Sequence, residues 1–176
     1  MSEYTKEELI TLVKQDSLAF NDWKASQTEV DLSEVDFSNI SLDGIDFSNV
    51  DLNSSSFADS HLVEVNFTNC DLTSVDFTRG NIVESDFTDS ILIGADFSYA
   101  TTNYCNFTQA DMAGTIFMES DLTNSDFSVS INLNACRFDE ETIWPEADML
   151  PEDFDINYRS DLSSLKDDEE TVQEDY

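Results

Sequence analysis

The dominant pattern in this sequence is a large residue at every fifth position from Leu32 to Phe127. Nineteen of these twenty central positions are apolar, and the exception is Thr102. The residue two places before each centre is small or β-branched, so each unit of five offers two positions that can face inward. A helix repeats every 3.6 residues and a strand every 2, so neither element alone explains a period of five. The pattern therefore predicts a stacked repeat architecture.

Polar residues flank the centres. The residue before the centre is Asp in eleven units and Asn in three, namely Asn66, Asn81 and Asn106, and the residue after it is mostly Ser or Thr. This pattern resembles the pentapeptide-repeat family over roughly residues 30–143, and in particular its cyanobacterial members. The resemblance implies an all-β solenoid, a right-handed quadrilateral β-helix in which each unit forms one side of a square coil.

Leu-type and Phe centres alternate, which supports a four-sided coil independently. With twenty residues per coil, each Phe stacks on a Phe and each Leu-type residue on another. The expected Phe columns begin at Phe37 and at Phe47 and continue in steps of twenty. Five coils at about 4.8 Å each predict a rod roughly 24 Å long.

Both ends of the repeat are expected to be covered, because an open coil would expose an unpaired edge. Thr5-Lys6-Glu7-Glu8 has the form of a capping box and predicts a helix over residues 5 to about 15. Phe20 and Trp23 are assigned to the core of this cap. After Phe127 the pattern slips by one residue to Leu133 and is expected to resume at the centres Phe138 and Ile143.

The predicted organisation has four segments. These are an N-terminal helical cap (1–29), the repeat (30–143), an irregular or helical C-terminal cap (144–165), and an acidic tail (166–176) expected to be mobile.

Composition narrows the possible partners. Seven basic against thirty-nine acidic residues leave a formal net charge of −32, which excludes direct nucleic-acid binding as a main activity. No apolar run reaches the length of a membrane span and no export signal is recognisable, so a cytoplasmic protein without membrane association is expected. Cys70, Cys105 and Cys136 occupy the inward small positions and are predicted to be buried, reduced thiols.

The sequence offers no catalytic constellation. The single histidine, His61, lies at an outward position without motif-spaced metal ligands or triad partners, and the four glycines form no phosphate-binding loop. We therefore expect no enzymatic activity, no catalytic, cofactor-binding or metal residues, and no cofactor.

The acidic surface suggests one specific function. Some pentapeptide-repeat proteins resemble B-DNA in size and charge and bind DNA gyrase, and residues 30–129 here contain eighteen acidic residues and one basic residue, Arg79. Eleven of the eighteen, however, are the Asp that the repeat itself specifies. A DNA-mimic protein that binds gyrase or another topoisomerase is thus an alternative hypothesis.

One face of the predicted coil breaks the polar pattern. Around the centres Leu42, Leu62, Ile82, Thr102 and Leu122, both flanking consensus columns are broken, whereas the face that begins at Phe47 keeps an unbroken hydroxyl column. The predicted partner-binding residues on and beside this face are Val63, Val83, Tyr99, Tyr104, Glu64 and Glu84. The leading hypothesis is a regulatory adaptor that binds an unidentified protein partner through this lateral face. A third interpretation is an inert rod whose acidic tail recruits partners.

Overall fold

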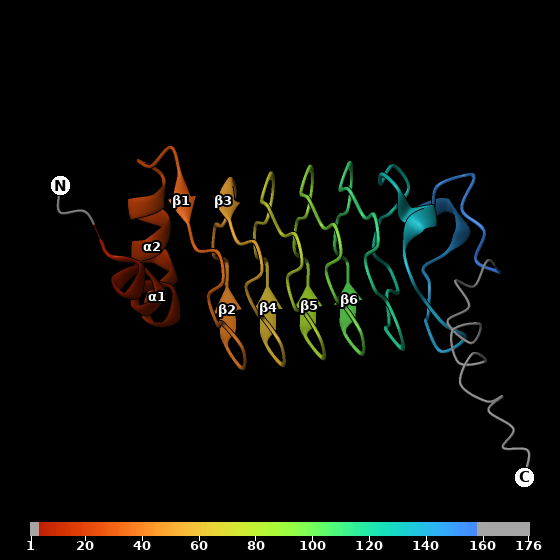
Figure 1. Ribbon diagram of the computed structural model, residues 1–176, viewed down its shortest axis with the longest axis horizontal. Helices are drawn as coiled ribbons and strands as arrows, with labels where there is room; N and C mark the ends of the chain where they lie inside the picture. The colour runs from red at the N-terminus through yellow and green to blue at the C-terminus, as the bar shows by residue number, and fades with distance from the viewer. Residues whose placement is uncertain (1–3, 158–176) are drawn as a thin grey trace, which may run out of the picture.

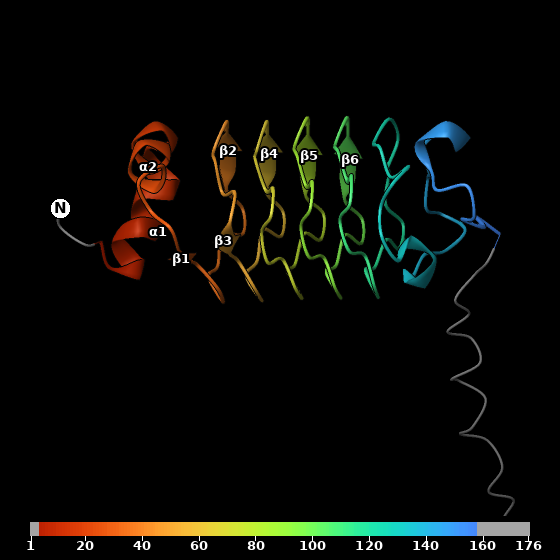
Figure 2. The same ribbon diagram turned by 90° about the horizontal axis from the view of Figure 1, so that it is seen from above.

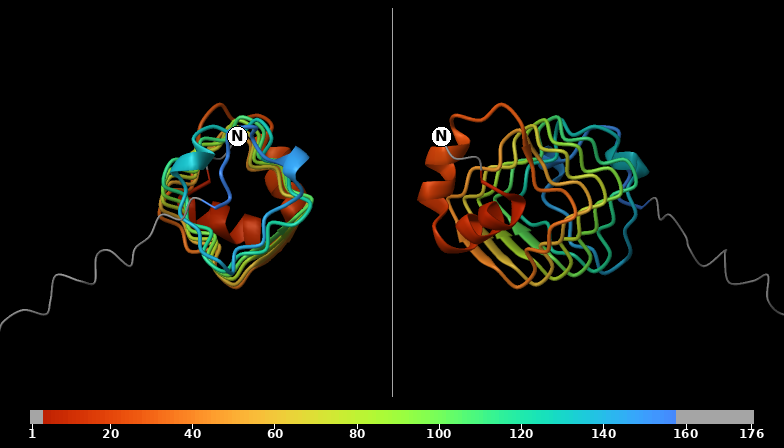
Figure 3. Two further views of the ribbon diagram at one scale, coloured as in Figure 1. Left: turned by 90° about the vertical axis from the view of Figure 1, so that its right-hand side faces the viewer. Right: turned by 60° about the vertical axis from the view of Figure 1, so that its left-hand side comes forward.

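The computed structural model describes residues 4–157, which form a rod of stacked, four-sided coils with two helices at its N-terminal end (Figure 1). The views in Figures 2 and 3 show the coils edge-on and along the rod axis, where their square outline is visible. All strand pairs are parallel: β1 (Val30–Asp31) pairs with β3 (Val50–Asp51), and a four-stranded sheet follows the order β2-β4-β5-β6. Its strands are β2 (Ser41–Asp43), β4 (His61–Val63), β5 (Asn81–Val83) and β6 (Thr101–Asn103).

The register confirms the expected coil of twenty residues. Leu42 pairs with Leu62, and Leu62 with Ile82, each exactly one coil of twenty positions further along the chain. The two Phe columns stack as predicted, with ring centroids 4.5–5.7 Å apart along each column. Rings of the two columns also meet edge-on across the core, a favourable geometry for aromatic pairs.

The interior is filled by the two inward positions of each unit. All twenty central residues from Leu32 to Phe127 are buried, Thr102 included. The Thr102 hydroxyl lies 3.3 Å from the Ser125 hydroxyl, so the one polar centre has a hydrogen-bonding neighbour. The three cysteines are buried free thiols, as expected, and the Cys70 thiol donates to the carbonyl of Phe47.

The Asp and Asn before the centres have a structural role. In thirteen of these fourteen residues, the side-chain Oδ1 accepts the backbone N–H of the residue two places later, at 2.8–3.2 Å. This local bond favours a turn over a continuing strand. The residue three places after the Asp or Asn then turns the corner, and most corner residues have a positive φ of 50–72°.

The face centred on Leu42, Leu62, Ile82 and Thr102, which we call the Leu42 face, lacks this turn. Ser41, His61, Asn81 and Thr101 stand before its centres, and none of them accepts that N–H in the described part of the chain. The backbone there continues as three-residue strands, which form the four-stranded sheet. The sheet ends after β6, where Asp121 restores the turn by accepting the N–H of Thr123.

Two helices lie across the N-terminal end of the coils (Figure 1). α1 (Lys6–Gln15) begins at the predicted capping box, in which Thr5 and Glu8 bond reciprocally. α2 (Ser17–Lys24) was not predicted as a helix, although Asp16 caps it by accepting the N–H of Ala19. Its Phe20 is fully buried and packs 5.6 Å from the ring of Phe47, and the half-buried Trp23 packs beside Phe20.

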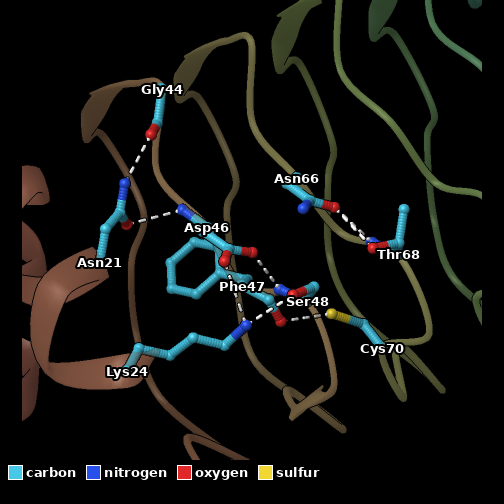
Figure 4. A network of polar contacts seen from close by, with 9 residues as sticks. All are labelled: Asn21, Lys24, Gly44, Asp46, Phe47, Ser48, Asn66, Thr68 and Cys70. Carbon is cyan, nitrogen blue, oxygen red and sulfur yellow. Dashed lines mark hydrogen bonds and ion pairs between the residues drawn. The ribbon is translucent and has the colours of Figure 1, made fainter. Parts of the chain in front are cut away.

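Side chains of these helices bond to the edge of the first coil (Figure 4). The Asn21 amide donates to the carbonyl of Gly44 and its Oδ1 accepts the N–H of Asp46, while Lys24 contacts Asp46 and Ser48. One coil later, the N–H of Asn66 donates to the carbonyl of Ile45 in the coil before it. The Oδ1 of Asn21 therefore occupies the place that a backbone carbonyl oxygen of a preceding coil would take.

The C-terminal end corrects one sequence-based expectation. Phe138 is a buried centre as predicted, but Ile143 is 54% exposed and Trp144 is buried in its place. Ile143 pairs with Asp121, so Trp144 lies over Leu122; the chain has gained a second extra residue between Phe138 and Trp144. The Trp144 ring packs on Phe117, Phe127 and Phe138.

Beyond Trp144, the described chain contains the 3-10 helix Ala147–Met149, which follows an earlier one at Leu133–Ala135. The predicted acidic tail at 166–176, and the end of the predicted C-terminal cap, lie outside the described residues.

Candidate partner-binding face

The Leu42 face presents a flat parallel sheet to solvent. Val63 and Val83 are direct neighbours in register, between Asp43 and Asn103 in the coils on either side. Both valines are half-buried, because each packs between its neighbours in the column while one side stays open. His61 and Asn81 form the other outward column of the same strands and are exposed.

One corner of this face combines an aromatic ring with carboxylates. Glu64, Glu84 and Tyr104 occupy equivalent corner positions of three successive coils, with φ values of 50°, 52° and 56°. Successive coils place such residues about 4.8 Å apart along the rod. The Tyr104 side chain is 62% exposed. The structure thus brings five of the six predicted residues together: Val63, Val83, Glu64, Glu84 and Tyr104.

Tyr99 lies at the other edge of the Leu42 face. It shares its corner column with Asp59, Arg79 and Glu119 rather than with Tyr104. The negative charge of Glu119, together with a hydrogen bond from the Tyr99 hydroxyl, raises the pKa of Tyr99. The two tyrosines lie at the corners that flank Thr102, so one side of the coil separates them.

Arg79 lies in the same corner column as Tyr99, and the sequence analysis did not assign it to the site. Its guanidinium donates two hydrogen bonds to the carboxylate of Asp59, at 2.7 and 2.6 Å. This pair lowers the pKa of Asp59 and raises that of Arg79. The spacing of twenty residues between Asp59 and Arg79 is the signal that predicts their contact, since it equals one coil.

The corner formed by Glu64, Glu84 and Tyr104 has no compensating positive charge. Three ion pairs occur in residues 4–157, and they join Lys6 to Asp31, Lys24 to Asp46, and Arg79 to Asp59. The side-chain carboxylates of Glu64 and Glu84 have no hydrogen bond or ion pair within that range, although the backbone N–H of each donates to the next coil. The Leu42 face therefore joins apolar area to uncompensated negative charge.

Other chemistry is absent from the described residues. They contain no group of three or more His, Cys, Asp or Glu side chains arranged to hold a metal ion. None of the helices within residues 4–157 is both long and apolar enough to cross a membrane. His61 is exposed on β4, in agreement with its predicted surface position.

Comparison with solved structures finds several proteins that resemble this chain at low identity. The chain resembles a pentapeptide-repeat protein, alr5209 of Nostoc PCC 7120, with 23% identity over 52% of this chain and 75% of the other, at a TM-score of 0.44. Rfr23 from the cyanobacterium Cyanothece 51142 shares 15% identity over 72% and 99% of the two chains, with a TM-score of 0.40. QnrB1, a plasmid-mediated fluoroquinolone resistance protein, shares 18% identity over 64% and 84%, with a TM-score of 0.36.

The assignment of this chain to a protein family rests on sequence models of the repeat. A model of a pentapeptide repeat region matches residues 30–107, and a model of eight pentapeptide repeats matches residues 90–128. No curated protein matches the chain in sequence. The two matched stretches together span more than half of the chain and coincide with the coils described above. The chain belongs to the pentapeptide-repeat family.

Proposed function

We propose that this protein is a non-enzymatic regulatory adaptor that binds a protein partner through the Leu42 face. The observation that carries this proposal is the local loss of the repeat's turn-forming hydrogen bond, which leaves a flat sheet with Val63 and Val83 side by side. The exposed Tyr104 adds an aromatic side chain of the kind enriched at the centres of protein interfaces. Buried reduced thiols support a role in the cytoplasm.

The test is affinity capture with a double variant that keeps the fold. Val83→Asp is suited to this because Asp43 already occupies the same column, and Tyr104→Asn because Asn124 has a positive φ at the equivalent corner. Both changes remove apolar area from the surface and leave the core intact. We expect at least a tenfold loss of captured partner, in line with the energetics of interface hot spots. Circular dichroism and the melting temperature should stay close to wild type.

A matched control changes the adjacent face. Asn69→Asp with Gln109→Asn likewise introduces one Asp and one Asn, at exposed corner residues of the Phe47 column whose positive φ both residues tolerate. This control variant should still capture the partner. If it loses the partner while the Val83→Asp, Tyr104→Asn variant keeps it, the interface lies on the other face.

One observation favours a second function, binding to DNA gyrase or another topoisomerase as a DNA mimic. Acidic residues occur on all four faces of the coils, and the only basic residue between 30 and 129, Arg79, is neutralised by Asp59. A supercoiling assay with a quinolone present tests this function. Inhibition or protection that weakens steeply with salt would support it, and neither effect at micromolar protein would rule it out.

A further inference from the structure

We infer that the Leu42 face recognises a basic segment of a protein partner, with arginine or lysine side chains spaced by apolar ones. This inference rests on the proposed function and names the chemistry of the partner at the same face. It follows from three properties of the corner beside β4 and β5: its charge, its aromatic ring and its adjoining apolar strip.

The first property is charge. Glu64 and Glu84 lie in successive coils at the same corner, and within the described chain neither is paired with a cation. The backbones that carry these two carboxylates are about 4.8 Å apart, so the like charges repel each other, and a cation placed between them relieves that repulsion. A guanidinium or ammonium group from a partner fits this requirement.

The second property is the Tyr104 ring, which follows Glu84 in the corner column. Its side chain is 62% exposed, and its hydroxyl has no hydrogen-bonding partner among residues 4–157. A cation over a tyrosine face is attracted by the ring quadrupole, and arginine is the more frequent partner in such contacts. Beside a carboxylate, the ring favours a planar guanidinium in particular.

The third property is the apolar strip formed by Val63 and Val83, which adjoins the corner along neighbouring strands. Carboxylates alone would attract any cation, including free ions. The strip instead favours a chain in which apolar side chains lie close to the basic ones.

A second copy of this chain does not meet these requirements. The basic residues within residues 4–157 lie elsewhere. Lys6, Lys14 and Lys24 contact the first coil, Arg79 is paired with Asp59, and Arg137 is half-buried in the last coil beside Ile116. Two Leu42 faces brought together would oppose carboxylates with carboxylates. Like-charge juxtaposition of this kind disfavours association.

The test uses the full chain and a synthetic peptide of alternating arginine and leucine, with an asparagine–leucine peptide as the uncharged probe. Titration followed by amide chemical shifts should move the resonances of Val63, Val83, Glu84 and Tyr104 with the basic peptide only. Raising NaCl from about 0.1 M to about 1 M should weaken the binding, because the Debye length falls from roughly 10 to 3 Å. Shifts spread evenly over the four faces would overturn the inference, since they would indicate unspecific attraction to a negative rod.

Matched variants separate the local charge from the total charge. Glu64→Gln with Glu84→Gln removes two charges at the corner, and we expect about three- to tenfold weaker peptide binding. Asp51→Asn with Asp71→Asn removes two charges from the opposite face and keeps the turn, because Asn66 and Asn106 form the same bond. This control should change binding by less than about twofold. Equal losses in the two variants would contradict a specific basic-segment site.

The outcomes also distinguish this inference from the adaptor function. If the captured partner depends on Val83 and Tyr104 but is retained by the Glu64→Gln, Glu84→Gln variant, the adaptor function stands and the basic-segment inference fails. If capture is independent of Val83 and Tyr104, the adaptor function itself fails.

Discussion

At the scale of single residues, the core depends on side chains that repeat one coil apart. Phe87 is fully buried between Phe67 and Phe107, with ring centroids at 4.9 and 4.8 Å. Phe77 and Phe97 contact the same ring edge-on. Because the neighbours on all sides belong to a continuous backbone ladder, the coil cannot collapse into a cavity left at this position.

We therefore expect Phe87→Ala to lower the free energy of unfolding by about 3–5 kcal/mol. Urea denaturation followed by circular dichroism measures this change. Thr102→Leu serves as the comparison, since it replaces the one polar centre and should leave stability unchanged or higher. An unaltered unfolding midpoint for Phe87→Ala would be incompatible with the Phe column.

The buried cysteines give a second residue-scale prediction. Burial raises the pKa of Cys70, Cys105 and Cys136 to about 12, from an ordinary value of 9.0. The folded protein keeps these thiols protonated while the unfolded chain ionises them, so their contribution to stability falls as pH rises above about 9. At pH 8, a thiol reagent should react with none of them in the native state and with all three after unfolding. Rapid reaction in the native protein would show that the coils open readily.

At the scale of secondary-structure elements, the N-terminal helices complete the first coil through polar side chains. The Asn21 amide supplies both a donor for Gly44 and an acceptor for Asp46, and Lys6 and Lys14 donate to the carbonyls of Ser33 and Asp36. These groups belong to an edge that would otherwise pair with a preceding coil. An edge satisfied in this way does not template pairing with another chain.

Replacing Asn21 by Ala should lower the free energy of unfolding by about 1–3 kcal/mol, because it leaves the half-buried Asp46 N–H without an acceptor. Hydrogen exchange should show faster exchange of the Asp46 amide. Asn21→Asp keeps the acceptor and loses the donor, so it should fall between Ala and wild type. Wild-type stability and exchange in Asn21→Ala would mean that the helices pack without this bond.

At the scale of the whole molecule, charge opposes the compact state. The formal net charge is −32, and only three ion pairs join a basic to an acidic side chain within residues 4–157. Yet most of the pre-centre Asp residues are held by local hydrogen bonds that form the turns, as in the bond from the Thr88 N–H to Asp86. The Asp residues that form the turns thus also repel one another along the rod, because their carboxylates carry the same charge.

We expect the melting temperature to rise by several degrees when NaCl increases from about 0.01 M to about 1 M, because the Debye length shortens from roughly 30 to 3 Å. Thermal denaturation at neutral pH measures the effect. Near pH 4, where carboxylates take up protons, the same change in salt should have much less influence. A melting temperature that is independent of salt at neutral pH would indicate that the charges are too far apart to interact.

The repeat, its inward columns and its twenty-residue coil could be predicted from the amino-acid pattern, as the pairing of Leu42 with Leu62 confirms. These features depend on patterns within a few residues, which every unit repeats. They therefore leave a clear signal in the chain. The capping box at Thr5 and the broken columns of the Leu42 face were visible for the same reason.

Only the tertiary structure decided what happens where the repeat ends or changes. It showed that the buried centre is Trp144 and not Ile143, because an inserted residue changes which side chain meets Leu122. It also placed the Asn21 amide at the edge of the first coil. Each of these outcomes depends on contacts between segments about twenty residues apart or on the three-dimensional course of a coil, and local sequence patterns do not specify them.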